Sequence, residues 1–111
     1  MEKKGSIILV PFPFTNQADS KIRPALVLAS HRDDITVLFI SSRPSNKLSQ
    51  TDFLVSQKHP DFAKTGLRTD SVIHVNKITS LDRKLSIKKI GALSQALLAG
   101  VDLQLKKYLS L

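Results

Sequence analysis

Arg23 is the first residue of this sequence whose type and position suit chemistry. It stands directly before Pro24, and proline biases the residue before it toward an extended backbone. A guanidinium held at the start of a strand can grip phosphate oxygens through two parallel hydrogen bonds and can stabilise developing negative charge. The pattern therefore predicts an anion site at Arg23, although an ordinary exposed loop arginine would have the same sequence.

Ser41 and Ser42 are hydroxyl residues at the end of another apolar segment. If a hairpin spanning residues 25–41 closes about a turn at residues 31–34, symmetry about the turn brings Arg23 and Ser41 to one edge of the sheet. A hydroxyl beside a guanidinium could hold and orient a phosphate. Ordinary hydrogen bonding at a strand end would also account for both serines.

His74 is the candidate for proton transfer. It lies within a β-rich segment, residues 71–75, where alternation places Val72, His74 and Asn76 on one face. Histidine titrates near neutral pH and can act as an acid or a base. A solvent-exposed strand histidine is an equally good interpretation of the same pattern.

The charge balance points to a polyanionic partner. Lys and Arg total 17 against nine Asp and Glu, which gives a formal net charge of +8 and a pI near 10.1. Nucleic acid is the first candidate and an anionic membrane the second, and an acidic protein partner would also suit this charge. No segment approaches the ~20 apolar residues of a membrane-spanning helix, so no membrane partner is expected.

Several classes of chemistry lack their residues. There is no cysteine, which removes disulfides, thiolate nucleophiles and cysteine zinc sites. The four glycines are scattered, so no phosphate-binding loop is expected. No paired-histidine metal motif occurs, and we expect neither metal nor cofactor. The short apolar run after the N-terminal residues is not a signal sequence, which favours a cytoplasmic protein.

The elements that must position these residues are mostly strands. Apolar, β-branched segments predict strands over residues 6–10, 25–29, 35–41, 53–55, 71–75, 78–81 and 87–90, with a loop or helical turn over 57–64. Pro11 and Gly91 are expected to end their strands. The prediction is one domain, residues 1–111, that is mostly β (α+β), with five to seven strands in a small barrel or strongly curved sheet.

A C-terminal helix follows the strands. Ser94 can cap it, and Gly100 is expected to weaken it by about 1 kcal/mol relative to alanine. Apolar residues recur at helical spacing on one face, which should pack on the core. These residues are Leu97, Leu98, Val101, Leu105, Tyr108 and Leu109.

The order of these motifs resembles the PemK/MazF toxin family. Five segments carry the resemblance: GSIILVPFPFT (5–15), KIRPALVL (21–28), ISS (40–42), SVIHVNKITSLD (71–82) and KKIGALS (88–94). The resemblance implies an SH3-like barrel, a homodimer, an antitoxin partner whose acidic tail covers a basic RNA groove, and metal-independent cleavage of single-stranded RNA. Arg23 matches the family's catalytic arginine and Ser41 the position of its catalytic threonine.

The remaining candidates are basic and polar residues near these positions; Arg43 and Lys47, which follow the two serines, could guide the RNA backbone. The residues expected to bind RNA are Lys21, Ser42, Arg43, Lys47, Asn76 and Lys77. In one branch of the family an Arg and an Asp on the later strand are proposed as catalytic; here His74 and Asn76 stand at those positions. Asn76 cannot act as a carboxylate base, and His74 takes part of the proton-transfer role. The alternatives are a CcdB-like toxin that inhibits gyrase and an RNA-binding protein that does not cut.

Overall fold

The computed structural model describes residues 2–11, 21–42 and 47–111. Its elements run β1 (Ser6–Pro11), β2 (Ile22–His31), β3 (Asp34–Ser42), β4 (Asp52–Val55), a 3₁₀ turn η1 (Phe62–Thr65), β5 (Ser71–Asp82), a second 3₁₀ turn η2 (Arg83–Leu85), β6 (Lys88–Ala92) and α1 (Gln95–Leu109). The mostly β architecture with one C-terminal helix confirms the fold class.

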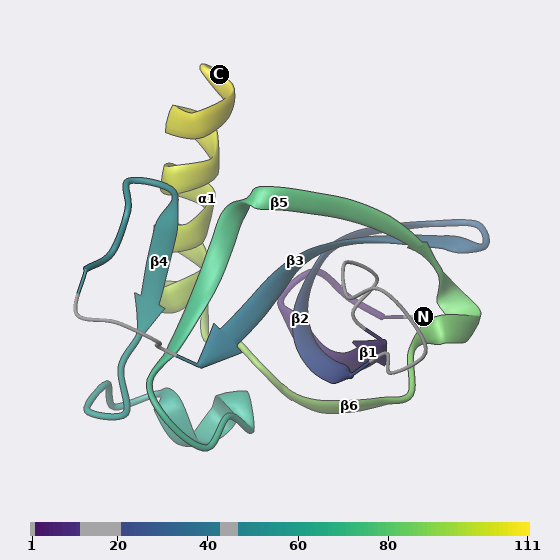
Figure 1. Ribbon diagram of the computed structural model, residues 1–111, viewed down its shortest axis with the longest axis horizontal. Coiled ribbons are helices and arrows are strands. Elements are labelled where there is room, and N and C mark those ends of the chain that lie inside the picture. Colours follow the sequence, from purple (N-terminus) through teal and green to yellow (C-terminus); the bar gives the residue numbers. More distant parts are fainter. Residues whose placement is uncertain (1, 12–20, 43–46) are drawn as a thin grey trace.

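The strands form a single antiparallel sheet in the order β4-β5-β3-β2-β1-β6. The sheet curls strongly, and β1, β2, β3, β6 and the far half of β5 wrap around a common centre (Figure 1). β4 and β6 remain as its two edges. The result is an open sheet with the shape of a small barrel rather than a closed one.

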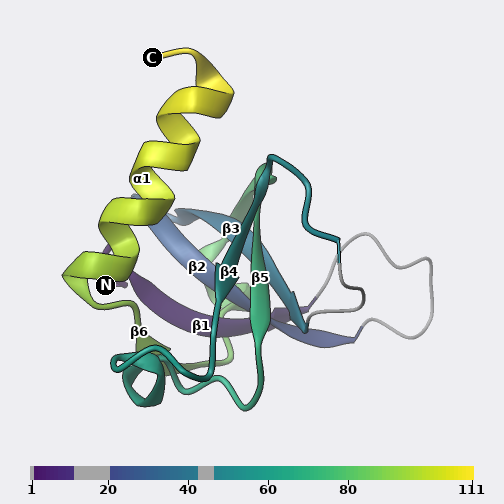
Figure 2. The ribbon, with the colours of Figure 1, turned by 90° about the vertical axis from the view of Figure 1, so that its left-hand side faces the viewer.

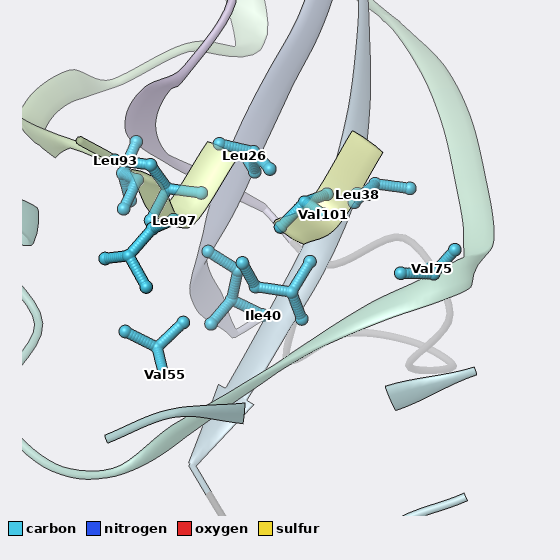
Figure 3. Packing of buried hydrophobic residues seen from close by; sticks show 10 residues of the cluster. Leu26, Leu38, Ile40, Val55, Val75, Leu93, Leu97 and Val101 are labelled. Carbon is cyan, nitrogen blue, oxygen red and sulfur yellow. The ribbon is translucent and has the colours of Figure 1, made fainter. Parts of the chain in front are cut away.

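The central strands are buried on both faces, which explains why they read as continuous apolar runs. Successive residues alternate between two clusters, so that Leu26 belongs to one while its neighbours Ala25 and Val27 belong to the other. The first cluster lies between the sheet and α1 and includes Leu97 and Val101 (Figure 3). The second is formed by the alternate residues of the same strands, among them Val37 and Phe39.

The β2–β3 hairpin has the predicted turn. His31 pairs with Asp34, and Arg32 between them adopts a left-handed backbone with φ of 55°. The pairing continues inward to Ala25 and Phe39. Residues 23 and 41 each lie two positions beyond that last pair, because an irregularity between Val27 and Ala29 shifts the pairing by one residue from strict symmetry about the turn.

β5 is one strand where the sequence predicted two, over residues 71–75 and 78–81. Its pairing with β3 breaks in the middle, because Leu38 pairs with Ile78 but Ile40 pairs with Ile73. Four residues of β5, 74–77, thus correspond to the single residue Phe39 of β3, and this excess bends the strand. This bend separates the two apolar segments that sequence periodicity took for separate strands.

Two expected strand ends also differ. Pro11 pairs with Ile22 and is itself the last residue of β1, one residue beyond the predicted end of the strand. Gly91 pairs with Ile7 inside β6. The glycine is needed there for close approach, since a Cβ at this position would lie 2.3 Å from the carbonyl carbon of Thr65 in η1.

Helix α1 begins as predicted and leaves the sheet before it ends. The Ser94 hydroxyl accepts a hydrogen bond from the Leu97 amide at 3.3 Å. Leu97 and Val101 are buried, but Tyr108 and Leu109 are 47% and 46% exposed, and the last turns project past the sheet (Figure 2). The predicted core-facing stripe is therefore wrong for these last two residues, because the sheet offers nothing to cover them.

Gly100 has a packing role that helix propensity does not reveal. A Cβ there would lie 2.7 Å from Cε1 of the Phe53 ring on β4. The side chain of Gln104, one turn further along α1, donates to the carbonyl oxygens of Gln50 and Asp52, both at 2.7 Å. The helix thus holds the short edge strand β4 in place.

We expect Gly91→Ala to lower the free energy of unfolding by about 1–3 kcal/mol, because the added methyl overlaps the η1 backbone rather than a movable side chain. Urea unfolding followed by circular dichroism measures the change. Exposed Ala99→Ser is the control and should stay within about 0.5 kcal/mol of wild type. An unchanged midpoint for Gly91→Ala would show that η1 does not pack against β6 as described.

Candidate nucleic-acid site

Two adjoining hollows, each of about 380 Å³, lie at the end of the sheet where the central strand β2 begins and its neighbour β3 ends. We call them together the rim groove, and they share Arg23, Ile40, Ser41 and Ser42. His74 and Lys77 line one hollow. Arg68, Ser71 and Lys88 line the other.

Arg23 occupies the centre of the rim groove, because it lines both hollows. It lies in β2 opposite Val10 of β1, and it is half-buried. Pro24 follows it and pairs with Leu9, so the guanidinium extends from a fixed backbone. The predicted meeting of Arg23 and Ser41 at one sheet edge is confirmed.

Ser41 and His74 are in direct contact. The Ser41 hydroxyl oxygen lies 2.7 Å from Nε2 of His74, a short hydrogen bond. Ser41 pairs with Val72, and His74 follows two residues later on the same face of β5. Ile73 and Val75, which alternate with His74, are buried in the first cluster, so His74 faces away from that core.

Asp52 completes this row of groups, and the sequence did not single it out. It is the first residue of β4 and pairs directly with His74 across the strands. Its Oδ1 lies 3.3 Å from His74 Nδ1, while its Oδ2 accepts a hydrogen bond from the Ser49 amide at 2.9 Å. Both side chains are largely covered, with 21% of His74 and 16% of Asp52 exposed.

Only some of the other residues predicted from the sequence line the rim groove. Ser42 and Lys77 line the rim groove. Lys21, Lys47 and Asn76 are exposed and are not among the lining residues of either hollow. Arg43 lies outside the described residues.

Arg68 and Lys88 are basic residues of the rim groove that the sequence analysis missed. Arg68 precedes β5 and Lys88 begins β6, and both are exposed. In the sequence, each of them is a basic residue at or shortly before the start of a strand, which is also the pattern that drew attention to Arg23. What the sequence lacks is the pairing of β6 with β1, which brings Lys88 opposite Leu9.

The electrostatics of the rim groove favour an anion with several oxygens. Arg23, Lys77, Arg68 and Lys88 supply cations along it. The Asp52 carboxylate contacts Nδ1 of His74, the ring nitrogen that does not contact Ser41. Among residues 2–11, 21–42 and 47–111, no group of three acidic or histidine side chains gathers to hold a metal ion.

Solved structures share this architecture. A Mycobacterium tuberculosis toxin, MazF-mt6, superposes with a TM-score of 0.72 at 18% identity, over 96% of this chain and 97% of that one. A MazE–MazF structure from Deinococcus radiodurans gives 0.74 at 19% identity, over 99% and 96%. An endoribonuclease in complex with its cognate antitoxin, from a mycobacterial species, gives 0.75 at 11% identity, over 100% and 97%.

The fold is thus the one seen in MazF toxins. The family model of PemK-like, MazF-like toxins of type II toxin–antitoxin systems matches residues 3–109. The chain belongs to this family, which confirms the resemblance found in the sequence. No curated protein sequence matches significantly. In the part of the chain that the structure describes, none of the helices has the length and apolar character to span a membrane.

Proposed function

We propose that this protein is a single-domain toxin that cleaves single-stranded RNA without a metal and thereby inhibits growth. The observation that carries the proposal is the meeting of Arg23, Ser41 and His74 at one hollow of a PemK/MazF fold. The three side chains come from β2, β3 and β5, so the fold itself assembles them. The match to residues 3–109 supports the assignment of the whole chain as one toxin domain.

The proposed reaction is an internal transfer within the RNA. The 2′-oxygen attacks the adjacent phosphorus, the bond from phosphorus to the 5′-oxygen breaks, and the products carry a 2′,3′-cyclic phosphate and a 5′-hydroxyl. Arg23 stabilises the charge on the phosphate in the transition state. Ser41 holds the scissile phosphate, and His74 moves the proton.

RNA contacts outside the reacting group are proposed for the basic and polar residues at this edge. Ser42 and Lys77 have support from the structure because they line the rim groove. Lys21, Arg43, Lys47 and Asn76 remain proposals that rest on the sequence. Single-stranded RNA suits an open groove of this kind, since its bases can splay outward for recognition.

An antitoxin is the proposed protein partner. The solved MazE–MazF assembly and the endoribonuclease bound to its cognate antitoxin support this at the level of the family. A net charge of +8 suits an acidic antitoxin segment that competes with RNA for the same cations. We also propose a homodimer and action in the cytoplasm, where messenger RNA is available.

The first test is Arg23→Gln, which should slow RNA cleavage in EDTA about 100- to 1,000-fold, because one charge-stabilising donor contributes about that much. Arg32→Asn is the matched control: it removes a cation at the other end of β2 and suits the left-handed backbone there. Gel analysis with end-group mapping should find cyclic phosphates from wild type and from Arg32→Asn.

Two outcomes contradict the proposal. Equal cleavage by Arg23→Gln would remove Arg23 from the mechanism. Cleavage of an all-deoxyribose strand would exclude attack by a 2′-hydroxyl. If the folded wild type cuts no RNA, gyrase supercoiling and RNA-binding assays separate the gyrase-directed and non-cutting alternatives.

Phosphate contacts make a second prediction. Lys77→Ala should weaken binding of a single-stranded RNA and lower the slope of log K against log salt by about 0.7, the value for one phosphate contact. Lys84→Ala is the matched control, because Lys84 lies in η2 beyond the opposite end of β5 from Ser71. Fluorescence anisotropy at several salt concentrations measures both slopes. Equal slopes for the two variants would place the RNA elsewhere.

A further inference from the structure

Three groups from three strands lie in a row at the rim groove. Ser41 on β3 contacts Nε2 of His74 on β5 at 2.7 Å, and Nδ1 of the same ring lies 3.3 Å from Asp52 on β4. The row ends there, because the second carboxylate oxygen of Asp52 accepts from the Ser49 amide. Hydroxyl, imidazole and carboxylate in this order are the groups by which serine hydrolases move a proton.

The carboxylate determines which nitrogen of His74 carries the proton. An ionised carboxylate only accepts hydrogen bonds, so Asp52 Oδ1 at 3.3 Å from Nδ1 favours the neutral ring that carries its hydrogen on Nδ1. Nε2 is then left with its lone pair toward Ser41, and the serine hydroxyl donates to it. Without the carboxylate, nothing on the Asp52 side of the ring would favour one nitrogen over the other as the carrier of the hydrogen.

We infer that Asp52 is a positioning residue that keeps His74 in the Nδ1–H form, so that Ser41, His74 and Asp52 act as one proton relay. The inference rests on the proposed RNA cleavage and deepens it. Asp52 touches no part of the substrate in this arrangement. It acts through His74, which the cross-strand pairing of Asp52 and His74 fixes opposite it.

The relay gives each proton a defined path. In this relay the Ser41 hydroxyl contacts the 2′-hydroxyl beside the scissile phosphate, and Arg23 contacts the phosphate oxygens. As the 2′-oxygen bonds to phosphorus, its proton passes to the Ser41 oxygen while the Ser41 proton passes to Nε2 of His74. The resulting imidazolium is stabilised by Asp52. As the bond from phosphorus to the 5′-oxygen breaks, the proton returns from His74 to that oxygen, so the reaction consumes no water and releases no proton.

Charged groups of both signs surround His74. Arg23 from β2 and Lys77 from β5 line the same hollow as His74. Asp52 from β4 is the acidic group that faces the ring among the described residues. It balances these cations when His74 takes up the proton, and its largely covered position strengthens that effect.

The experiment begins with nitrogen NMR of the RNA-free protein at about pH 8.5, where an ordinary histidine is neutral. His59 is an internal reference of opposite kind, because its Nδ1 accepts a hydrogen bond from the Asp61 amide and its hydrogen therefore lies on Nε2. His74→Gln assigns the His74 signals. We expect His74 to show the Nδ1–H pattern and His59 the Nε2–H pattern.

Asp52→Asn tests the role of the carboxylate while keeping its shape. The amide oxygen can still accept from Ser49, and the Gln104 contact uses the backbone of residue 52. We expect His74 to lose its Nδ1–H preference and kcat to fall about 100-fold, with KM unchanged. Asp82→Asn is the matched control, since Asp82 accepts from the Lys84 amide and lies at the other end of β5.

A double variant separates positioning from direct catalysis. If Asp52 acts through His74, then Asp52→Asn combined with His74→Gln should cleave no more slowly than His74→Gln alone. Independent effects that multiply would overturn the inference. So would a wild-type His74 in the Nε2–H form, or an Asp52→Asn variant whose His74 signals do not change.

The two failures can be told apart. A wild type that shows the expected His74 form, loses it in Asp52→Asn and cuts no RNA would refute the proposed nuclease while leaving the positioning by Asp52 established. A wild type that cuts RNA with no dependence on Asp52 would refute the inference and leave the nuclease intact.

Discussion

The break in pairing between β3 and β5 is the constraint on which the rest of this structure depends. Two residue steps on β3, from Leu38 to Ile40, correspond to five on β5, from Ile78 back to Ile73. The extra residues bend β5 and leave its outer side to the short strand β4. The carbonyl of Thr51, just before β4, accepts from the Val75 amide. His74 lies at this bend, between a serine on one neighbouring strand and a carboxylate on the other. A regular ladder would have kept β5 straight along β3.

The two apolar clusters make this irregularity tolerable. Strands buried on both faces have strongly specified register, since a slip of one residue would exchange the contents of the clusters. The curl of the sheet then brings the start of β2, the end of β3 and the start of β6 to one hollow. Arg23, Ser41 and Lys88 meet there although they are far apart in sequence. The chemistry of the rim groove is thus a product of sheet curvature more than of any local motif.

Local patterns were enough to predict much of this arrangement. The meeting of Arg23 and Ser41 follows from symmetry about the turn at residues 31–34, and the helix start follows from Ser94. Asp52 could not be found in the same way, because the sequence around β4 does not reveal the register in which β4 pairs with β5. The bend in β5 could not be predicted either, since the periodicity of apolar residues shows which face of a strand is buried but not which strand it pairs with. The exposed end of α1 depends on where the sheet stops, which is a property of the whole fold.

The contact between Gln104 and β4 has a consequence for how the protein comes into being. Synthesis proceeds from the amino end, so all six strands are made before the helix that carries Gln104. Until that side chain reaches the carbonyl groups of Gln50 and Asp52, the edge strand lacks its anchor from α1. A chain that stops before Gln104 thus contains every residue of the row but lacks the side chain that ties its carboxylate end to α1.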